Sequence, residues 1–217
     1  MTDDKALEGA RARIAAYRER IDRLDDDSLD MLFREGRNHN WFQDRDVSDD
    51  QLREIWDLVK FGSTSANTLP ARILFLRSPE AKERLKPCLM GLNVEKTMQA
   101  PVTALLAYDL KFFENFAKLY PVRPEMGNQY RDNPVLAERF AFQQCTLQGA
   151  YLLLAIRAVG LDAGAMGGFN NAAADEAFLK GTTWKSNFLC NIGYGDLQGI
   201  KGPRLYRYAF DEVCQII

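Results

Sequence analysis

Apolar residues near the start of the chain recur with a helical spacing. They are Leu7, Ala10, Ile14, Tyr17, Ile21 and Leu24, and most of their neighbours are charged or small. Steps of three and four residues place them on one side of a helix, so the pattern predicts an amphipathic helical extension within residues 1–30. The apolar stripe needs a cover, which is either the rest of the same chain or a partner subunit.

A second helix is predicted after residue 48. Ser48 and Gln51 have the spacing of a capping box, and an apolar helix face follows them. The residues predicted to be buried on that face are Leu52, Ile55, Trp56 and Val59. Residues 62–70 then break the periodicity with Gly, Ser, Thr, Asn and Pro, which are typical of a loop.

Short apolar runs predict strands at residues 73–76, 102–108, 186–194 and 206–210. The run at 102–108 is apolar enough to be buried on both faces of a sheet. Ser78 and Pro79 are suited to begin a helix directly after the first strand. The longest helical pattern covers 134–159, and it is apolar nearly all round in its second half, which indicates a central helix. A strand in the glycine-dense stretch 164–168 and a short helix over 172–179 follow.

The order of these elements lacks a regular strand–helix–strand rhythm. It favours an α+β fold over a doubly wound sheet, and the length fits a single domain spanning residues 1–217. No GxGxxG motif follows a predicted strand and no P-loop occurs, so a Rossmann-type nucleotide site is not supported.

Composition excludes several classes of function. A formal net charge of −2 offers no positive field for nucleic acid or an anionic membrane. The first thirty residues contain no continuous apolar stretch, so we expect a cytoplasmic protein without a signal peptide or membrane span. Four cysteines without a CxxC pair and a single histidine argue against a metal site, a disulfide framework and a triad hydrolase. An organic cofactor becomes the better expectation.

Ordered segments throughout the chain resemble the nitroreductase superfamily. They are GRNHNWFQDRDVSDDQL, FGSTSANTLPARILFLRSPEAKERL, LNVEKTMQAPVTALLAYD, TLQGAYLLLAIRAVGLDAGAMGGFN, KSNFLCNIGYG and PRLYRYAFDEV. The resemblance runs from about Phe33 to the C-terminus and is strongest to the malonic semialdehyde reductase branch of pyrimidine degradation. It implies a homodimeric sandwich in which helices flank a central, mainly antiparallel sheet and each subunit binds one FMN at the interface.

The resemblance also implies which residues hold the phosphate end of the cofactor. Arg37 and Arg204, from opposite ends of the chain, correspond to arginines that clamp the FMN phosphate, and guanidinium groups suit charge-assisted bonds to phosphate. His39 occupies a position that contacts the ribityl-phosphate end in relatives. By residue type alone, each of these is more often a solvated side chain.

Other matched positions correspond to the flavin ring. Asn93 and Lys96, three residues apart on a predicted helical turn, match an asparagine and a lysine at the pyrimidine edge. Met166, Gly167 and Gly168 match the backbone that passes flavin N5 and O4, where glycine permits a close approach; a simple turn is the alternative for the glycines.

The loop of Ser63, Ser65 and Asn67 matches one that reaches the flavin of the neighbouring subunit in relatives. Ser63 stands where the family has proline.

The activity implied is ping-pong reduction, in which NAD(P)H gives hydride to flavin N5 and an acceptor then receives it. No catalytic side chain is expected, because the flavin carries the chemistry. The branch suggests a small 3-oxo acid such as malonic semialdehyde, reduced to 3-hydroxypropionate. A broad nitroarene or quinone reductase and a flavin-binding protein without turnover are the alternatives.

Overall fold

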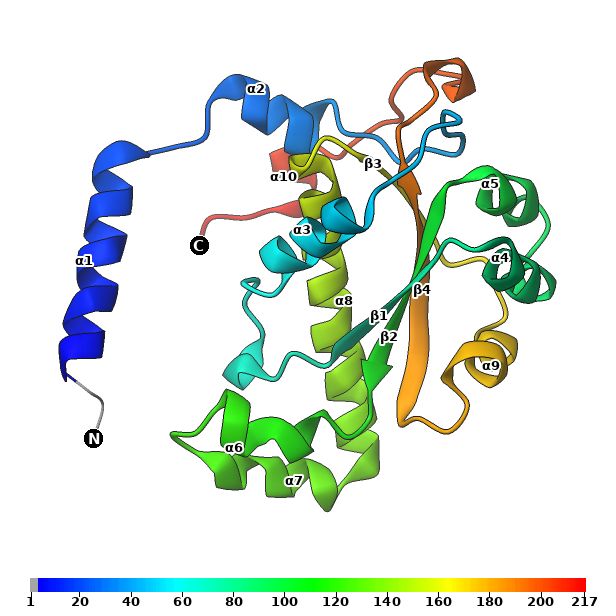
Figure 1. Cartoon of the computed structure of the whole chain (residues 1–217). Helices are drawn as coiled ribbons and strands as arrows, with labels where there is room; N and C mark the ends of the chain where they lie inside the picture. Colours follow the sequence, from blue (N-terminus) through cyan, green and yellow to red (C-terminus); the bar gives the residue numbers. More distant parts are fainter. Residues whose placement is uncertain (1–3) are drawn as a thin grey trace.

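The computed structural model describes residues 4–217, and a four-stranded antiparallel sheet organises it (Figure 1). The strands are β1 (Ala71–Leu76), β2 (Val102–Asp109), β3 (Asp162–Met166) and β4 (Trp184–Gly193), in the order β1-β2-β4-β3. Every residue of β2 is buried, which explains its continuous apolar sequence. The predicted α+β class with a mainly antiparallel sheet is therefore confirmed.

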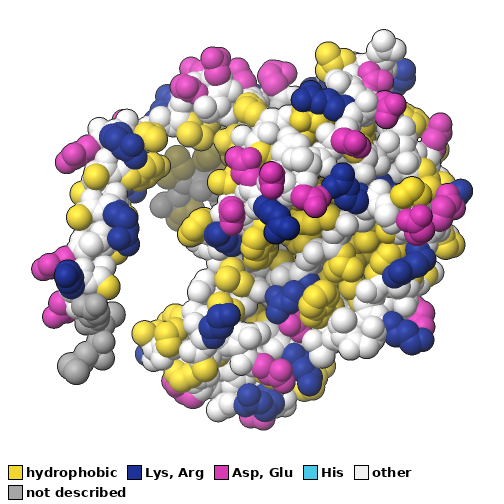
Figure 2. All heavy atoms as spheres, viewed as in Figure 1, with side chains coloured by type: hydrophobic (Ala, Val, Ile, Leu, Met, Phe, Trp, Pro, Cys, Tyr) yellow, Lys and Arg dark blue, Asp and Glu magenta, His cyan; other side chains and the backbone are white. Residues whose placement is uncertain are grey.

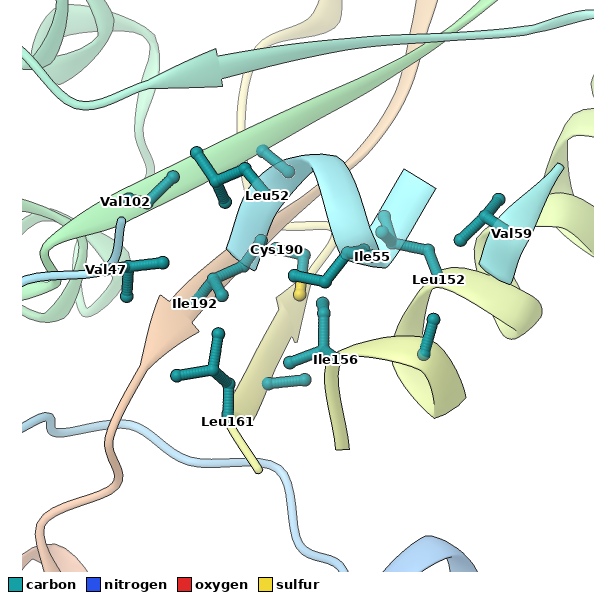
Figure 3. Packing of buried hydrophobic residues seen from close by; sticks show 13 residues of the cluster. Val47, Leu52, Ile55, Val59, Val102, Leu152, Ile156, Leu161, Cys190 and Ile192 are labelled. Atoms are coloured by element: carbon teal, nitrogen blue, oxygen red, sulfur yellow. The ribbon is translucent and has the colours of Figure 1, made fainter. Parts of the chain in front are cut away.

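Helices cover both faces of the sheet. On one face lie α3 (Asp49–Val59) and α8 (Pro134–Ala158); on the other lie α4 (Pro79–Leu85), α5 (Asn93–Gln99) and α9 (Asn171–Ala174) (Figure 1). The first face packs around Ile55 of α3, Ile156 of α8 and Cys190 of β4, whose side chains point toward one another in Figure 3. The sheet is thus the middle of three layers, and its edges stay accessible to loops.

The remaining elements are short. They are α2 (Asp26–Leu29), η1 (Asp30–Arg34), η2 (Ser65–Asn67), η3 (Lys86–Cys88), η4 (Phe112–Asn115), α6 (Phe116–Leu119), η5 (Pro124–Gly127), α7 (Asn128–Arg131), η6 (Asp175–Leu179), η7 (Leu197–Gly199) and α10 (Phe210–Val213). The predicted helix over 172–179 is divided between α9 and η6.

The capping box predicted for α3 is present. The Ser48 hydroxyl accepts a hydrogen bond from the Gln51 amide at 3.2 Å, and the Gln51 side chain accepts one from the Ser48 amide at 3.0 Å. Trp56, however, is 38% exposed rather than buried. The buried stripe consists of Leu52, Ile55 and Val59, and Trp56 lies about 100° around the helix from Ile55 at 3.6 residues per turn.

Only one face of the long helix α8 is buried in the sandwich. Its N-terminus is capped by the Asn133 side chain, which accepts a hydrogen bond from the Leu136 amide at 3.0 Å, and Gly160 with φ +77° follows its end. Gly149 brings the helix so close to the sheet that an added Cβ would lie 2.5 Å from the Phe188 ring. The other face exposes apolar side chains, namely Val135, Leu136, Phe142 and Leu147.

The N-terminal helix α1 (Asp4–Arg20) is the expected extension, but it ends before Ile21. None of its residues is buried. Figure 1 shows the helix beside the sandwich, and Figure 2 shows hydrophobic side chains on its surface. Ile14 is 60% exposed. The rest of the described chain, which was one of the two covers expected for the apolar stripe of α1, therefore does not bury it.

The strand predicted at 206–210 is wrong. The chain runs without regular structure to α10, and all residues from 201 to 217 are exposed. The alternation of Tyr206, Tyr208 and Phe210 has strand spacing, but a strand requires a neighbour for its backbone hydrogen bonds. Within residues 4–217 no strand pairs with this segment.

Candidate functional site

The site begins where residues 36–43 cross the end of β3 and β4. The His39 amide donates a hydrogen bond to the Ala163 carbonyl at 2.9 Å, and the Gln43 amide donates one to the Tyr194 carbonyl at 2.7 Å. The Ala165 amide donates in turn to the Asn38 side chain at 2.6 Å. These bonds fix a segment from the N-terminal part of the chain against the edge strand of the sheet.

The structure brings Arg37 and Arg204 together. The Arg37 guanidinium donates to the Gly202 carbonyl at 3.1 Å, and the Arg204 guanidinium donates to the Gly36 carbonyl at 3.2 Å. Within the described residues neither arginine forms an ion pair with a carboxylate, so neither guanidinium has an anionic partner there. A pocket of about 250 Å³ adjoins them; Arg37 and His39 line it, whereas Arg204 itself does not.

His39 is held by Asp162 at the start of β3. Its Nε2 lies 3.3 Å from Asp162 Oδ1, and the other carboxylate oxygen accepts a hydrogen bond from the Gly195 amide at 2.8 Å. The His39 side chain is only 8% exposed. Gly195 is required here, because an added Cβ would collide with the imidazole ring. The ring is therefore oriented by two residues that sequence reasoning did not identify.

Asn93 meets the segment after β3. Its side-chain amide donates to the Gly168 carbonyl at 2.7 Å, which joins α5 to the glycine pair. Gly167 is exposed, and a Cβ added there would have no protein atom within 4 Å, whereas one added at Gly168 would collide with Asn93. Met166 is buried at the end of β3. One of the paired glycines thus faces open space beside a hydrogen-bonding amide.

The Lys96 side chain, one helical turn after Asn93, points toward residues 37–40. Its ammonium donates to the Asn40 side chain at 3.3 Å. Partial burial lowers the pKa of Lys96 below its ordinary value. The Lys96 ammonium therefore lies between residues 37–40 and the adjacent glycines Gly167 and Gly168.

Ser63, Ser65 and Asn67 lie elsewhere in the subunit. They precede β1, whose first residue pairs with Tyr108 near one end of β2. Ala163, which contacts His39, aligns through β4 with Val102 at the other end of β2. The two ends of β2 are about 20 Å apart at ~3.3 Å per residue. The structure therefore does not bring this loop together with the other candidate residues of the same chain.

The loop is nevertheless held in an unusual conformation. Ala66, Asn67 and Leu69 have φ values of 49°, 50° and 40°. Left-handed backbone in non-glycine residues is costly and is concentrated at functional sites. Hydrogen bonds secure it: the Ser65 amide donates to Gln144 at 2.8 Å, and the Asn67 side chain donates to the Leu119 carbonyl at 2.9 Å. All three predicted residues remain exposed.

Sequence reasoning missed a buried lysine beneath this site. Lys82 is 4% exposed and donates hydrogen bonds to Thr97, Ala100 and Thr103. It lies on the short helix α4 among charged residues, so its sequence context is typical of a solvent-facing position. Only the packing of α4 against α5 shows that it is buried.

Among residues 4–217, no three His, Cys, Asp or Glu side chains are grouped so that they could hold a metal ion. In the same part of the chain, no helix combines the length and apolar character needed to cross a membrane.

Comparison with known families decides the classification. Residues 37–194 match the model of the Nitroreductase family. The chain belongs to the nitroreductase family. A Ralstonia pickettii protein named "Putative NADH dehydrogenase/NAD(P)H nitroreductase HadB" is 49% identical over 191 residues, which cover 87% of this chain and 97% of that protein. The resemblance inferred from the ordered segments is thereby confirmed at the level of the family.

Solved structures share the nitroreductase fold. A "putative nitroreductase in complex with FMN" from Exiguobacterium sibiricum superposes with a TM-score of 0.75 at 19% identity and covers 90% of this chain and 99% of its own. An enone reductase of gut-bacterial fatty acid metabolism, CLA-ER, gives a TM-score of 0.75 at 19% identity, with 90% and 100% covered. These likenesses concern the fold.

Proposed function

We propose that this nitroreductase-family chain is an FMN-dependent NAD(P)H oxidoreductase that works by ping-pong hydride transfer through flavin N5. The proposal rests on groups that follow one another along one end of the sheet. Arg37 and Arg204, which have no carboxylate partner among residues 4–217, are followed by Lys96 and then by the open position of Gly167. The order of these groups matches the order of the phosphate, the polar pyrimidine edge and the flat ring in FMN.

The phosphate end of FMN suits the two arginines. Arg37 and Arg204 use carbonyl acceptors and have no carboxylate partner among residues 4–217, so an incoming phosphate gains charge-assisted hydrogen bonds without breaking an ion pair. His39, oriented by Asp162, lies beside them. We assign these three residues to the phosphate and the adjoining ribityl chain.

The ring end suits the glycine pair and α5. Gly167 lacks any protein atom within 4 Å of an added Cβ, which leaves room for a planar ring against the backbone. We assign the main chain of Met166, Gly167 and Gly168 to the N5 and O4 side of the ring. Asn93 and Lys96 then face its pyrimidine edge.

The protein residues bind and orient rather than transfer protons. FMN, when bound, supplies the ring that receives hydride from NAD(P)H and passes it to an acceptor. A cation at Lys96 favours the form of the cofactor that carries negative charge near N1 and C2. We assign no general acid or base to the chain.

We further propose a homodimer in which Ser63, Ser65 and Asn67 contact the flavin of the partner. Their distance from the other candidate residues of the same chain supports this, as does the strained backbone of the loop. Two terminal segments expose apolar residues that a partner would cover: α1, and the tail with Leu205, Tyr206, Tyr208, Phe210, Val213, Ile216 and Ile217. The exposed apolar face of α8 adds to this surface.

The proposal also concerns the class of compound that accepts electrons from the reduced flavin. The resemblance to the malonic semialdehyde reductase branch favours a small 3-oxo acid such as malonic semialdehyde. The second candidate is a nitroarene or quinone, and the nitroreductase name of the Ralstonia relative favours the nitroarene. Stopped-flow reoxidation of the reduced holoprotein by each compound discriminates them, since the physiological class should react fastest at equal concentration.

The proposal as a whole is tested by absorbance. The purified protein should carry FMN, and in oxygen-free solution NADH or NADPH should bleach its flavin absorbance without added catalyst. A yellow protein whose flavin stays oxidised would indicate flavin binding without turnover. A colourless protein that does not take up added FMN would contradict the cofactor assignment.

A further inference from the structure

Lys82 is buried under the candidate site, and the proposed chemistry does not use it. Its ammonium donates three hydrogen bonds: to the Thr97 carbonyl at 2.7 Å, the Ala100 carbonyl at 2.9 Å and the Thr103 hydroxyl at 2.7 Å. Within residues 4–217 no carboxylate forms an ion pair with it. A buried cation without a counter-ion is unusual, because burial costs its hydration.

The hydrogen bonds indicate that Lys82 is protonated. The two carbonyls can only accept, and the Thr103 hydroxyl already donates to Asn191 Oδ1 at 2.7 Å. All three protons of an ammonium are therefore used and nothing donates to a neutral amine. Burial lowers the pKa of Lys82 to about 8, which leaves the charged form dominant at neutral pH.

The hydrogen-bond network continues from Lys82 to the flavin-facing residues. The Asn191 side chain, bonded to Thr103, donates to the main-chain carbonyl of Lys96 at 3.2 Å. The Thr97 hydroxyl donates to the sulfur of Met166 at 3.4 Å. Thr97, Thr103 and Asn191 are each fully buried, so water does not compete with these bonds. Lys82 thus connects to both α5 and the end of β3.

We propose that Lys82 is a positioning residue for the flavin site. Its ammonium fixes the C-terminal end of α5 and, with Thr103 and Asn191, the backbone at Lys96, so that the Lys96 side chain is held at the pyrimidine edge of the ring. This role rests on the proposed function, in which Lys96 faces the flavin. A methionine would fill the same volume but would leave the Thr97 and Ala100 carbonyls without this donor.

The test compares Lys82→Met, Lys96→Ala and the double variant as holoproteins. The readout is the ratio of dissociation constants for reduced and oxidised FMN, obtained from the midpoint potentials of bound and free flavin. Lys82→Met should raise this ratio by about ten-fold, in the direction of Lys96→Ala, and should add little in the Lys96→Ala background because coupled residues are not additive. Leu85→Ala, a fully buried position on the same helix, is the control.

The outcomes distinguish a positioning role of Lys82 from a purely structural role. A Lys82→Met protein that loses thermal stability like Leu85→Ala but keeps the wild-type ratio overturns the proposal. So does a shift that persists undiminished without the Lys96 side chain. If Lys96→Ala alone leaves the ratio unchanged, the placement of Lys96 is wrong and the role of Lys82 fails for that separate reason. Thr103→Val, which removes the hydroxyl from the network, gives the same comparison should Lys82→Met not fold.

Discussion

Replacing Gly167 by alanine separates folding from cofactor binding. Gly167 is exposed, its φ lies outside the left-handed region, and an added Cβ would have no protein atom within 4 Å. The apoprotein should therefore be as stable as wild type or more stable by about 0.4–1 kcal/mol, because alanine restricts the unfolded chain. If the flavin ring lies against this backbone, the new methyl group occupies part of its space.

The size of the binding effect follows from overpacking. An extra methyl in a filled contact typically costs about 1–3 kcal/mol, which corresponds to about five- to 150-fold in FMN affinity. Gly168→Ala should also weaken binding, because its Cβ would displace the Asn93 side chain. Gly9→Ala on α1, where the added Cβ would lie 3.7 Å from Arg13, should leave FMN affinity unchanged.

Two measurements decide this prediction. Urea unfolding of the apoproteins gives the stability, and quenching of flavin fluorescence on titration gives the FMN dissociation constant. A Gly167→Ala protein that folds normally and binds FMN with wild-type affinity would place the ring elsewhere and refute the assignment of the glycine pair. An unstable apoprotein would instead show that the conformation or surroundings of Gly167 differ from those described.

Three further results are expected. Arg204→Ala should weaken FMN binding by about ten- to a hundred-fold, since a hydrogen bond to a charged group contributes about 1.5–3 kcal/mol; an unchanged dissociation constant by fluorescence titration would remove Arg204 from the site. Because burial lowers the pKa of Lys82 to about 8, below the value of about 10.4 in an unfolded chain, the native state binds fewer protons between these values. Stability to urea should therefore rise with pH across this window relative to Lys82→Met, and parallel pH profiles would contradict it. Light scattering at low micromolar concentration should show a dimer, and a monomer that keeps its FMN would exclude the partner contact of Ser63, Ser65 and Asn67.

The parts of the fold that were predictable from sequence are those determined by local contacts. The α3 capping box, the continuous apolar run of β2 and the helix predicted over 134–159 all depend on residues close together in the chain. Trp56 was misplaced because helical periodicity defines a stripe but not its exact edges. The 206–210 strand failed because alternation says nothing about whether a neighbouring strand exists.

The candidate site was only partly predictable for a related reason. The Asn93 to Gly168 contact joins residues that resemblance alone had placed at one ring. Asp162 and Gly195, which orient His39, and Lys82, which supports α5, act through contacts between distant segments. Their residue types and neighbours carry no local pattern, so such supporting residues become visible only after the chain has folded.

The reciprocal bonds of Arg37 and Arg204 have a consequence for the newly made protein. The Arg37 segment leaves the ribosome early, whereas its acceptor at Gly202 follows 165 residues later in the chain, just before Arg204. A chain synthesised only to the end of β4 therefore cannot form these two bonds, although the whole sheet is already available to fold. If the two arginines hold the cofactor phosphate as proposed, cofactor capture waits for residues 202–204, and proteolysis of this exposed segment would abolish it.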